Sequence, residues 1–167
     1  MTTIPDLKPF IVSREFAAPR ELIWKAWTEP GRLMQWFGPK GSAMPAAKMD
    51  LRPSGICHFR LRSPDGRELW GKFIYREIVA PERLVYAQHF SDVEGGLTRH
   101  PLNPAWPLHM LTAVTFARQK GKTLLAVRWD PINPTPEESA SFDAGRDGMS
   151  QGWGGSLDRL GDYLAKV

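Results

Sequence analysis

The chain has 167 residues, of which 42% are hydrophobic and 11% aromatic, and its formal net charge is +4 at pH 7. This length and hydrophobic content indicate a single globular domain over residues 1–167, large enough to bury a core or to surround a cavity. The basic residues are scattered among 18 acidic ones, which argues against a nucleic-acid partner. No apolar run approaches the ~20 residues that are needed to cross a bilayer.

The cysteine content and the N-terminal segment indicate in which cellular compartment the protein is expected. The one cysteine, Cys57, cannot form an internal disulfide. The first residues show no basic stretch followed by an apolar run and a small-residue cleavage site. We therefore expect a cytoplasmic protein without a membrane segment.

In chain order, residues 9–16 are predicted to form a first strand, and Pro19 suits the first turn of the helix that follows. Glu29-Pro30-Gly31 ends this helix, and a second short helix extends to Gly38-Pro39. From residue 44 to residue 132 the apolar period changes to two, with turn signals between the runs. The pattern predicts hairpin-linked antiparallel strands with one apolar and one polar face.

The segment from Ser91 to Leu108 interrupts this pattern, because it is too long for a hairpin. Two adjacent glycines make its first half flexible, and three prolines stiffen its second half. Long loops inside compact domains are usually functional. We expect this loop to act as a lid, with Trp106 packing at the mouth of a pocket.

A final helix is predicted from Thr135, where a capping box with Glu138 fixes its start, to about residue 166. Between Gly145 and Leu164 it contains six glycines, and each costs up to about 1 kcal/mol relative to alanine. Gly145 and Gly152 fall on the apolar face of this helix. We expect them to mark close packing or an unfilled space, so that leucine at either position overpacks the fold.

Four histidines, His58, His89, His100 and His109, are the first candidates for metal or acid-base chemistry. None has the spacing of a metal motif, so we expect no metal and no other cofactor. Cys57 and His58 are adjacent in one strand and point to opposite faces, which excludes a nucleophile-base pair and favours a buried structural thiol.

Glu77 is the candidate for catalysis by a carboxyl group. The alternation places it on the strand face of Phe73 and Tyr75, where apolar surroundings would raise its pKa. The alternative is a Glu77 at the strand end that is either solvated or paired with Arg83 across the hairpin. We assign no catalytic residue, and Glu77, Tyr75 and Tyr86 remain the candidates for an enzyme.

Several motifs together resemble the START-like (SRPBCC) helix-grip superfamily, and within it the family of homologues of the activator of the heat shock protein 90 ATPase (AHSA type). The motifs are APRELIWKAW at 18–27, WFGP at 36–39, GKFIYREI at 71–78 with PERL at 81–84, GRDGM at 145–149, and Gly152-Trp153. The resemblance implies an α+β, Bet v-like fold. In this fold a curved antiparallel sheet wraps around a long C-terminal helix, two short helices follow the first strand, and an apolar cavity lies between sheet and helix.

The strand and helix periods predict which residues line such a cavity, although the same residues could fill a solid core. The predicted lining is Phe59, Leu61, Phe73, Tyr75, Tyr86, Met110, Thr112, Val127 and Trp129 from strands, and Phe142, Met149 and Trp153 from the helix.

Three functions stay open. Binding of a hydrophobic small molecule or lipid-like ligand is favoured by this lining. The alternatives are a cyclase or dehydratase that uses Glu77 with Tyr75 or Tyr86, and a chaperone partner that activates the heat shock protein 90 ATPase, which rests on the resemblance alone. Trp70, predicted to be exposed on the outer sheet face, suggests a homodimer contact.

Overall fold

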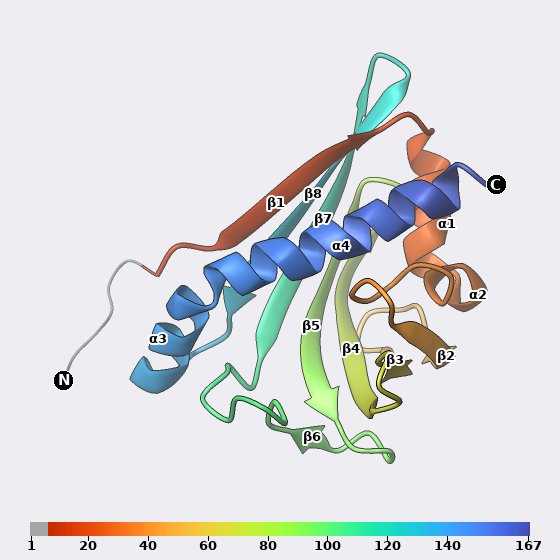
Figure 1. Cartoon of the computed structure of the whole chain (residues 1–167). Helices are drawn as coiled ribbons and strands as arrows, with labels where there is room; N and C mark the ends of the chain where they lie inside the picture. The colour runs from red at the N-terminus through yellow and green to blue at the C-terminus, as the bar shows by residue number, and fades with distance from the viewer. Residues whose placement is uncertain (1–6) are drawn as a thin grey trace.

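The computed structural model describes residues 7–167; residues 1–6, which belong to the N-terminal segment that lacks the features of a secretion signal, lie outside the described residues. Figure 1 shows the arrangement of the elements. In chain order they are β1 (Phe10–Phe16), α1 (Arg20–Thr28), α2 (Pro30–Leu33), β2 (Ala43–Met49), β3 (Ile56–Arg62), β4 (Glu68–Val79), β5 (Arg83–Ser91), β6 (Leu97–Thr98), β7 (Met110–Gln119), β8 (Lys122–Pro131), α3 (Pro136–Ala144) and α4 (Arg146–Leu164).

One antiparallel sheet forms the body of the fold. Its strands follow the order β1-β8-β7-β5-β4-β3-β2, and the short β6 pairs with the end of β5. The sheet is curved, and α4 runs across its concave face with α1 and α2 near one end and α3 at the other (Figure 1). This is the helix-grip arrangement, so the predicted α+β fold class is confirmed. Across residues 7–167 no helix is both long and apolar enough to span a bilayer.

An aromatic cluster joins the two short helices to α4. The buried Trp27 ring of α1 lies 4.9 Å from the Trp36 ring and stacks on Trp153 of α4 at 6.1 Å between ring centroids. The indole N–H of Trp36 donates to the Ala26 carbonyl at 3.0 Å, so this buried ring leaves no unpaired donor. Such edge-to-face and stacked pairs stabilise a core beyond the area that they bury. The cluster fixes the middle of α4, at Trp153, over the sheet.

The C-terminal helix is not continuous, and the prediction of one helix from Thr135 to residue 166 is wrong. The capping box is present at its start, with Thr135 and Glu138 each accepting a hydrogen bond from the other's backbone N–H. The chain leaves helical geometry at Gly145, whose φ of −91° and ψ of 7° separate α3 from α4. A Cβ at Gly145 would lie only 3.0 Å from Trp106 Cζ3. The missing side chain at this break leaves room for the Trp106 ring.

A bulge in β4 changes the position of Glu77. Tyr75 lies opposite Tyr86, but Glu77 lies opposite Val85, so β4 carries one extra residue at this point. An extra residue moves the following side chains to the other face of a strand. The expectation that Glu77 shares a face with Phe73 and Tyr75 is therefore wrong. Its side chain is exposed, and Oε1 accepts a hydrogen bond from Arg83 Nε at 3.2 Å.

Trp70 on the outer face of β4 is half-buried, in contrast to the predicted exposed position. Its ring stacks on His58 of β3 with 4.7 Å between centroids, and the Arg60 guanidinium lies 5.7 Å from it. Cross-strand neighbours thus cover the group that suggested a dimer contact. The homodimer stays a prediction, but an exposed Trp70 ring no longer supports it.

Candidate functional site: a cavity beneath the C-terminal helix

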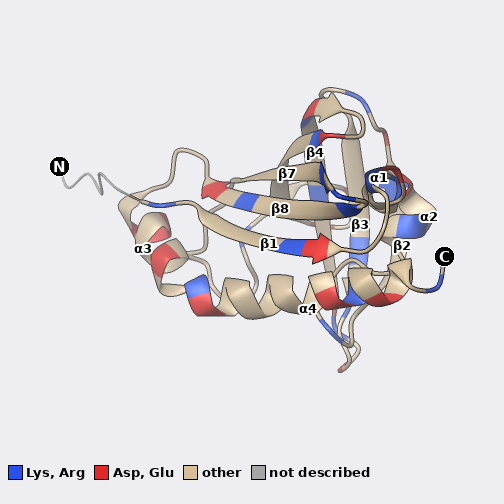
Figure 2. Cartoon of the chain, turned by 90° about the horizontal axis from the view of Figure 1, so that it is seen from above, with Lys and Arg blue, Asp and Glu red and all other residues tan. Residues whose placement is uncertain are grey.

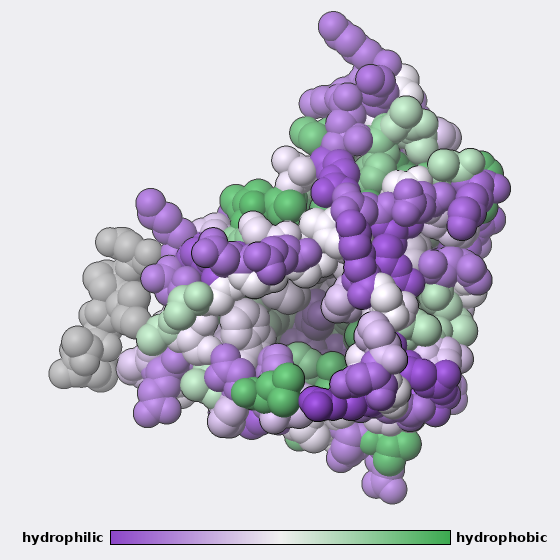
Figure 3. Space-filling view, viewed as in Figure 1, coloured by the Kyte–Doolittle hydropathy of each residue, from purple (hydrophilic) through white to green (hydrophobic). Residues whose placement is uncertain are grey.

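A cavity of about 510 Å³ lies between the concave face of the sheet, α4 and the loop at residues 92–109. Its volume falls within the range of small-molecule pockets. In the space-filling view a hollow opens below α4, beside the long loop (Figure 3). At the other end, the wall is formed by Phe37, Gly38 and Pro39, which follow α2.

Six of the residues predicted from periodicity stand around the cavity, together with one residue predicted from the long loop. They come from three strands, from α4 and from the loop, and they are aromatic, aliphatic or methionine side chains that offer an apolar surface. These residues are Phe59, Leu61, Met110, Trp129, Met149, Trp153 and the proposed lid residue Trp106.

The other predicted lining residues lie in the closed core. Those on strands lie one or two inward positions beyond a cavity residue: in β4, Phe73 and Tyr75 follow Gly71, and in β8 Val127 lies next to Trp129 on the inward face. Aromatic packing fills this level of the sheet, since the Phe73 ring stacks on Tyr86 at 4.1 Å. The predicted lining positions are therefore wrong for Phe73, Tyr75, Tyr86, Thr112, Val127 and Phe142.

Two glycines of α4 create part of the free space. A Cβ at Gly148 or at Gly152 would meet no atom within 4 Å, and both residues face the cavity. The expectation that leucine at Gly152 overpacks the fold is therefore wrong, because that side chain would extend into empty space. Gly145 does mark close packing, with the Trp106 ring 3.0 Å from where its Cβ would be. The glycine-rich helix thus serves both purposes, at different positions.

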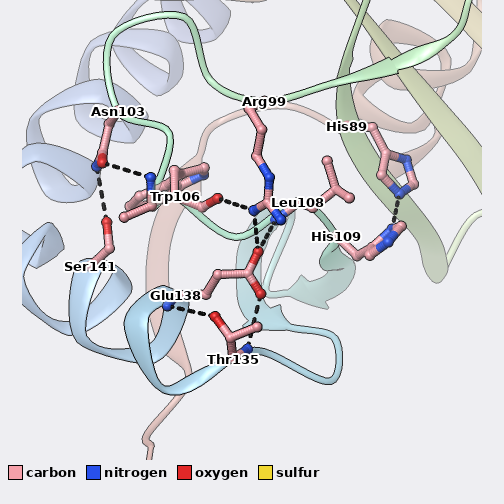
Figure 4. Close-up of polar contacts among 10 residues, drawn as sticks. His89, Arg99, Asn103, Trp106, Leu108, His109, Thr135, Glu138 and Ser141 are labelled. Atoms are coloured by element: carbon pink, nitrogen blue, oxygen red, sulfur yellow. Dashed lines mark hydrogen bonds and ion pairs between the residues drawn. The ribbon is translucent and has the colours of Figure 1, made fainter.

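The loop that forms one wall is tied to α3 by Glu138 (Figure 4). This carboxylate, 7% exposed, accepts hydrogen bonds from Leu108 N at 2.8 Å, from Thr135 N at 3.0 Å and from Arg99 Nη1. Burial opposes the ionisation of Glu138, but these three bonds outweigh it and lower its pKa below the ordinary value of 4.5. Glu138 is therefore an ionised group that holds the loop, at Arg99 and at Leu108, to the start of α3.

Two further contacts hold the middle of the loop. Asn103 Nδ2 donates to Ser141 Oγ of α3 at 2.9 Å. The Trp106 ring lies 6.0 Å from Phe142 and 6.4 Å from Trp129, measured between centroids. Trp106 therefore bridges α3 and β8 at the edge of the cavity.

A chain of hydrogen bonds crosses the sheet from Trp129 to Gln88. Trp129 Nε1 donates to Thr112 Oγ1 at 2.8 Å, and Thr112 Oγ1 donates to Gln88 Oε1 at 3.1 Å. Gln88 faces the cavity from β5, as His100 does from the loop. The sequence analysis missed Gln88, although one signal marks it: a polar residue at an inward-facing position, between Tyr86 and Phe90.

The enzyme candidates lie away from the cavity. Tyr75 and Tyr86 are buried in the core, burial raises the pKa of each, and neither hydroxyl has a hydrogen-bond partner among residues 7–167. Burial also raises the pKa of Cys57 to about 12, so this thiol is uncharged at neutral pH. Glu77 lies on the outer face of the sheet. No candidate acid, base or nucleophile of the enzyme alternative therefore touches the cavity.

His89 and His109 form a pair on the outer side of β5 and at the end of the loop. Their rings are joined by a 2.9 Å contact between His89 Nε2 and His109 Nδ1 (Figure 4). Burial first, and then the charges of His109, Lys72 and Arg76, lower the pKa of His89 to about 4. Within residues 7–167 no group of three His, Cys, Asp or Glu side chains is placed to hold a metal ion.

Comparisons with known proteins place this fold among relatives. A family model described as "Activator of Hsp90 ATPase homolog 1-like protein" matches residues 17–165. Protein Ms6760 from Mycobacterium smegmatis has a similar structure, with a TM-score of 0.77, 20% identity, and 93% of this chain and 90% of that one covered. A protein from Arthrobacter aurescens has a TM-score of 0.78 and 20% identity, with 95% of this chain and 87% of that one covered. The AHSA1 protein from Silicibacter pomeroyi has a TM-score of 0.71 and 18% identity, with 95% of this chain and 98% of that one covered. No curated protein sequence matches this chain.

Proposed function

The chain belongs to the family of Activator of Hsp90 ATPase homolog 1-like proteins, and from that premise we propose that it binds a hydrophobic small molecule or lipid-like ligand in the cavity beneath α4. One observation carries the proposal: a cavity of about 510 Å³ with an aromatic wall, in which Gly148 and Gly152 leave the helix side bare. Helix-interior glycines cost stability. A bound guest that uses the space they leave gives a reason to keep them.

The experiment fills the cavity from the helix side. Titration with N-phenyl-1-naphthylamine, an uncharged dye that fluoresces in apolar surroundings, reports occupancy. In Gly152→Leu the new side chain takes up part of the cavity, and we expect affinity to fall at least about fivefold, equivalent to ~1 kcal/mol. Saturable binding by the parent chain is the first requirement.

Gly154→Leu is the matched control. Gly154 also lies inside α4, and a Cβ there meets no atom within 4 Å, but it does not line the cavity. Both variants gain about the same helix propensity, ~0.5–1 kcal/mol, so a general effect on α4 appears in both. The proposal fails if the parent chain does not bind the dye, or if both folded variants bind it as the parent does.

Activation of the Hsp90 ATPase is a second candidate, because the description of the matched family names it. On the described surface the basic and acidic side chains are interleaved along β1, β8 and α4 (Figure 2). Several of them pair with each other, such as Arg14 and Lys40 with Asp158. Interleaved charges along these elements offer little electrostatic steering to a protein partner. We therefore expect this chain to leave the steady-state ATPase rate of Hsp90 unchanged, and a saturable increase would favour the second candidate.

A further inference from the structure

If the proposed binding function holds, the chemistry of the cavity wall limits which classes of ligand the cavity can bind. Among the described residues, no Lys, Arg, Asp or Glu lines the cavity. An ion that enters an apolar site without a partner loses its hydration without compensation. The cavity therefore disfavours free carboxylates, phosphates and amines, and favours an uncharged molecule.

The wall is not wholly apolar, and Gln88 is its best-oriented polar group. The indole of Trp129 can only donate, so Thr112 Oγ1 accepts that bond and is free to donate to Gln88. Oε1 of Gln88 takes up this donation. The amide orientation follows from the chain of donors, and it leaves Nε2 as the free end. No acceptor among the described residues hydrogen-bonds to Nε2, and this atom is not sealed in the core.

His100 is another polar group of the wall, and it is also a donor. Its Nδ1 accepts a hydrogen bond from Leu102 N at 3.0 Å, which places the proton of the neutral ring on Nε2. Burial lowers the pKa of His100, so the ring is neutral at pH 7. The ring is held against Phe90, with 4.7 Å between centroids.

The remaining amide of the wall is already engaged. Asn103 donates to Ser141 and accepts from the backbone N–H of Ala105. The free hydrogen-bonding groups of the Gln88 and His100 side chains are thus both N–H donors, in a cavity that lacks charge. Ser156, the hydroxyl of the wall, already donates to the Gly38 carbonyl at 2.9 Å. The free donors of Gln88 and His100 therefore favour a ligand that supplies acceptors.

We propose that the cavity takes an uncharged hydrophobic molecule bearing a carbonyl-type oxygen, and that Gln88 Nε2 is the donor that recognises this oxygen. Thr112 and Trp129 act as positioning residues, because they hold the Gln88 amide in the orientation that presents Nε2. A hydrogen bond in a dry cavity is directional, so it fixes which end of the ligand lies against β5.

The test compares two probes of similar shape, 2-acetylnaphthalene, which carries a ketone oxygen, and 2-isopropylnaphthalene, which does not. Displacement of N-phenyl-1-naphthylamine gives both dissociation constants for the parent chain and for Gln88→Met, a substitution of similar length without donor or acceptor. The measured quantity is the ratio of the two constants, because it cancels any general change in the cavity. We expect Gln88→Met to shift this ratio against the ketone by about three- to tenfold, the range for one net hydrogen bond.

Two further arms separate a direct hydrogen bond from a packing effect. The carbonyl stretching band of the bound ketone should lie at lower frequency in the parent chain than in Gln88→Met. Thr112→Val should shift the ratio in the same direction as Gln88→Met, whereas Thr112→Ser, which keeps the hydroxyl, should not.

2-Naphthoate at pH 7 tests the preference for uncharged ligands. It should fail to displace the dye at concentrations about a hundredfold above the dissociation constant of the ketone, because its charge has no partner.

The outcomes distinguish the two proposals. If both neutral probes bind and neither the ratio nor the carbonyl band changes in folded Gln88→Met, the assignment of Gln88 is overturned while cavity binding stands. Tight binding of 2-naphthoate overturns the preference for uncharged ligands. If neither the dye nor either neutral probe binds the parent chain, the proposed function fails and this inference fails with it.

Discussion

The bond network of Glu138 gives the sharpest prediction about stability. The substitution Glu138→Gln keeps the size of the side chain but removes its charge and replaces one acceptor oxygen by an N–H donor. Glu138 Oε2 accepts from Leu108 N and Arg99, and Oε1 accepts from Thr135 N. Either orientation of the new amide therefore sets its NH₂ group against a donor. The capping box of α3 or the attachment of the loop is lost.

The magnitude follows from which bonds are shielded from water. Arg99 is 46% exposed, so its ion pair contributes little by itself. The bonds from the backbone to the buried carboxylate are charge-assisted, and each contributes about 1.5–3 kcal/mol. We expect the loss of one of them, with the repulsion that replaces it, to lower the free energy of unfolding by about 3 kcal/mol. For a chain of this length that corresponds to a fall in Tm of about 6–12 °C.

The control substitution lies at the same helix end as Glu138, and one of the assays reports on the loop that Glu138 holds. Glu137, the neighbouring acid in the first turn of α3, is exposed, so Glu137→Gln removes the same charge from the same helix end and should change stability by less than about 0.5 kcal/mol. Urea unfolding measures both, and hydrogen exchange of the Leu108 amide reports the attachment of the loop. The pKa of Glu138 is lowered by folding, so its stabilisation is present above pH 4.5 and is lost as the pH falls below that value. Equal stability and equal Leu108 exchange in the two variants at pH 7 would refute the reasoning.

Two further predictions concern the helix break and the histidine pair. Gly145→Leu should destabilise the chain by about 1–3 kcal/mol in urea unfolding, because its Cβ falls 3.0 Å from Trp106; Gly154→Leu is the control, and equal stability of the two variants would mean that Trp106 moves aside freely. His89 has a folded pKa of about 4, below its ordinary 6.5, so the unfolded chain binds the extra proton between these values and stability should decline as the pH falls from 6.5 towards 4. In His89→Gln this slope should be shallower, and an identical slope in urea titrations at several pH values contradicts the assignment.

How much of the fold could be predicted depended on regular alternation. Along β3 no residue is inserted, so the inward positions of Cys57, Phe59 and Leu61 were predicted correctly. In β4 a single extra residue before Glu77 reversed the faces, and nothing in the local composition marks that bulge. The helix break escaped detection for a related reason: Phe142 and Met149 are seven residues apart, so the apolar face continues across Gly145 although the helix does not.

The position of the cavity was harder to predict than which residues point to the inner face of the sheet. Periodicity shows that Phe59 and Phe73 both point inward, but it does not show at which level of a curved sheet the helix comes close enough to close the core. That level depends on curvature and on the angle of α4, which are tertiary properties. Gln88 was detectable in principle, because a polar residue at an inward position requires a hydrogen-bond partner. The identity of that partner, Thr112, required the register between β5 and β7.

Methionine methyl groups offer the most direct test that the cavity takes a hydrophobic guest. Met110 and Met149 line the cavity, whereas Met44 is equally buried but lies outside it. Selective ¹³C labelling of the methionine methyls, followed by addition of N-phenyl-1-naphthylamine, reports where the dye binds. The account predicts saturable ring-current shifts, and contacts to dye protons, for Met110 and Met149, with Met44 unmoved. Unshifted Met110 and Met149 signals at saturating dye, or dye contacts confined to other methyls, would contradict it.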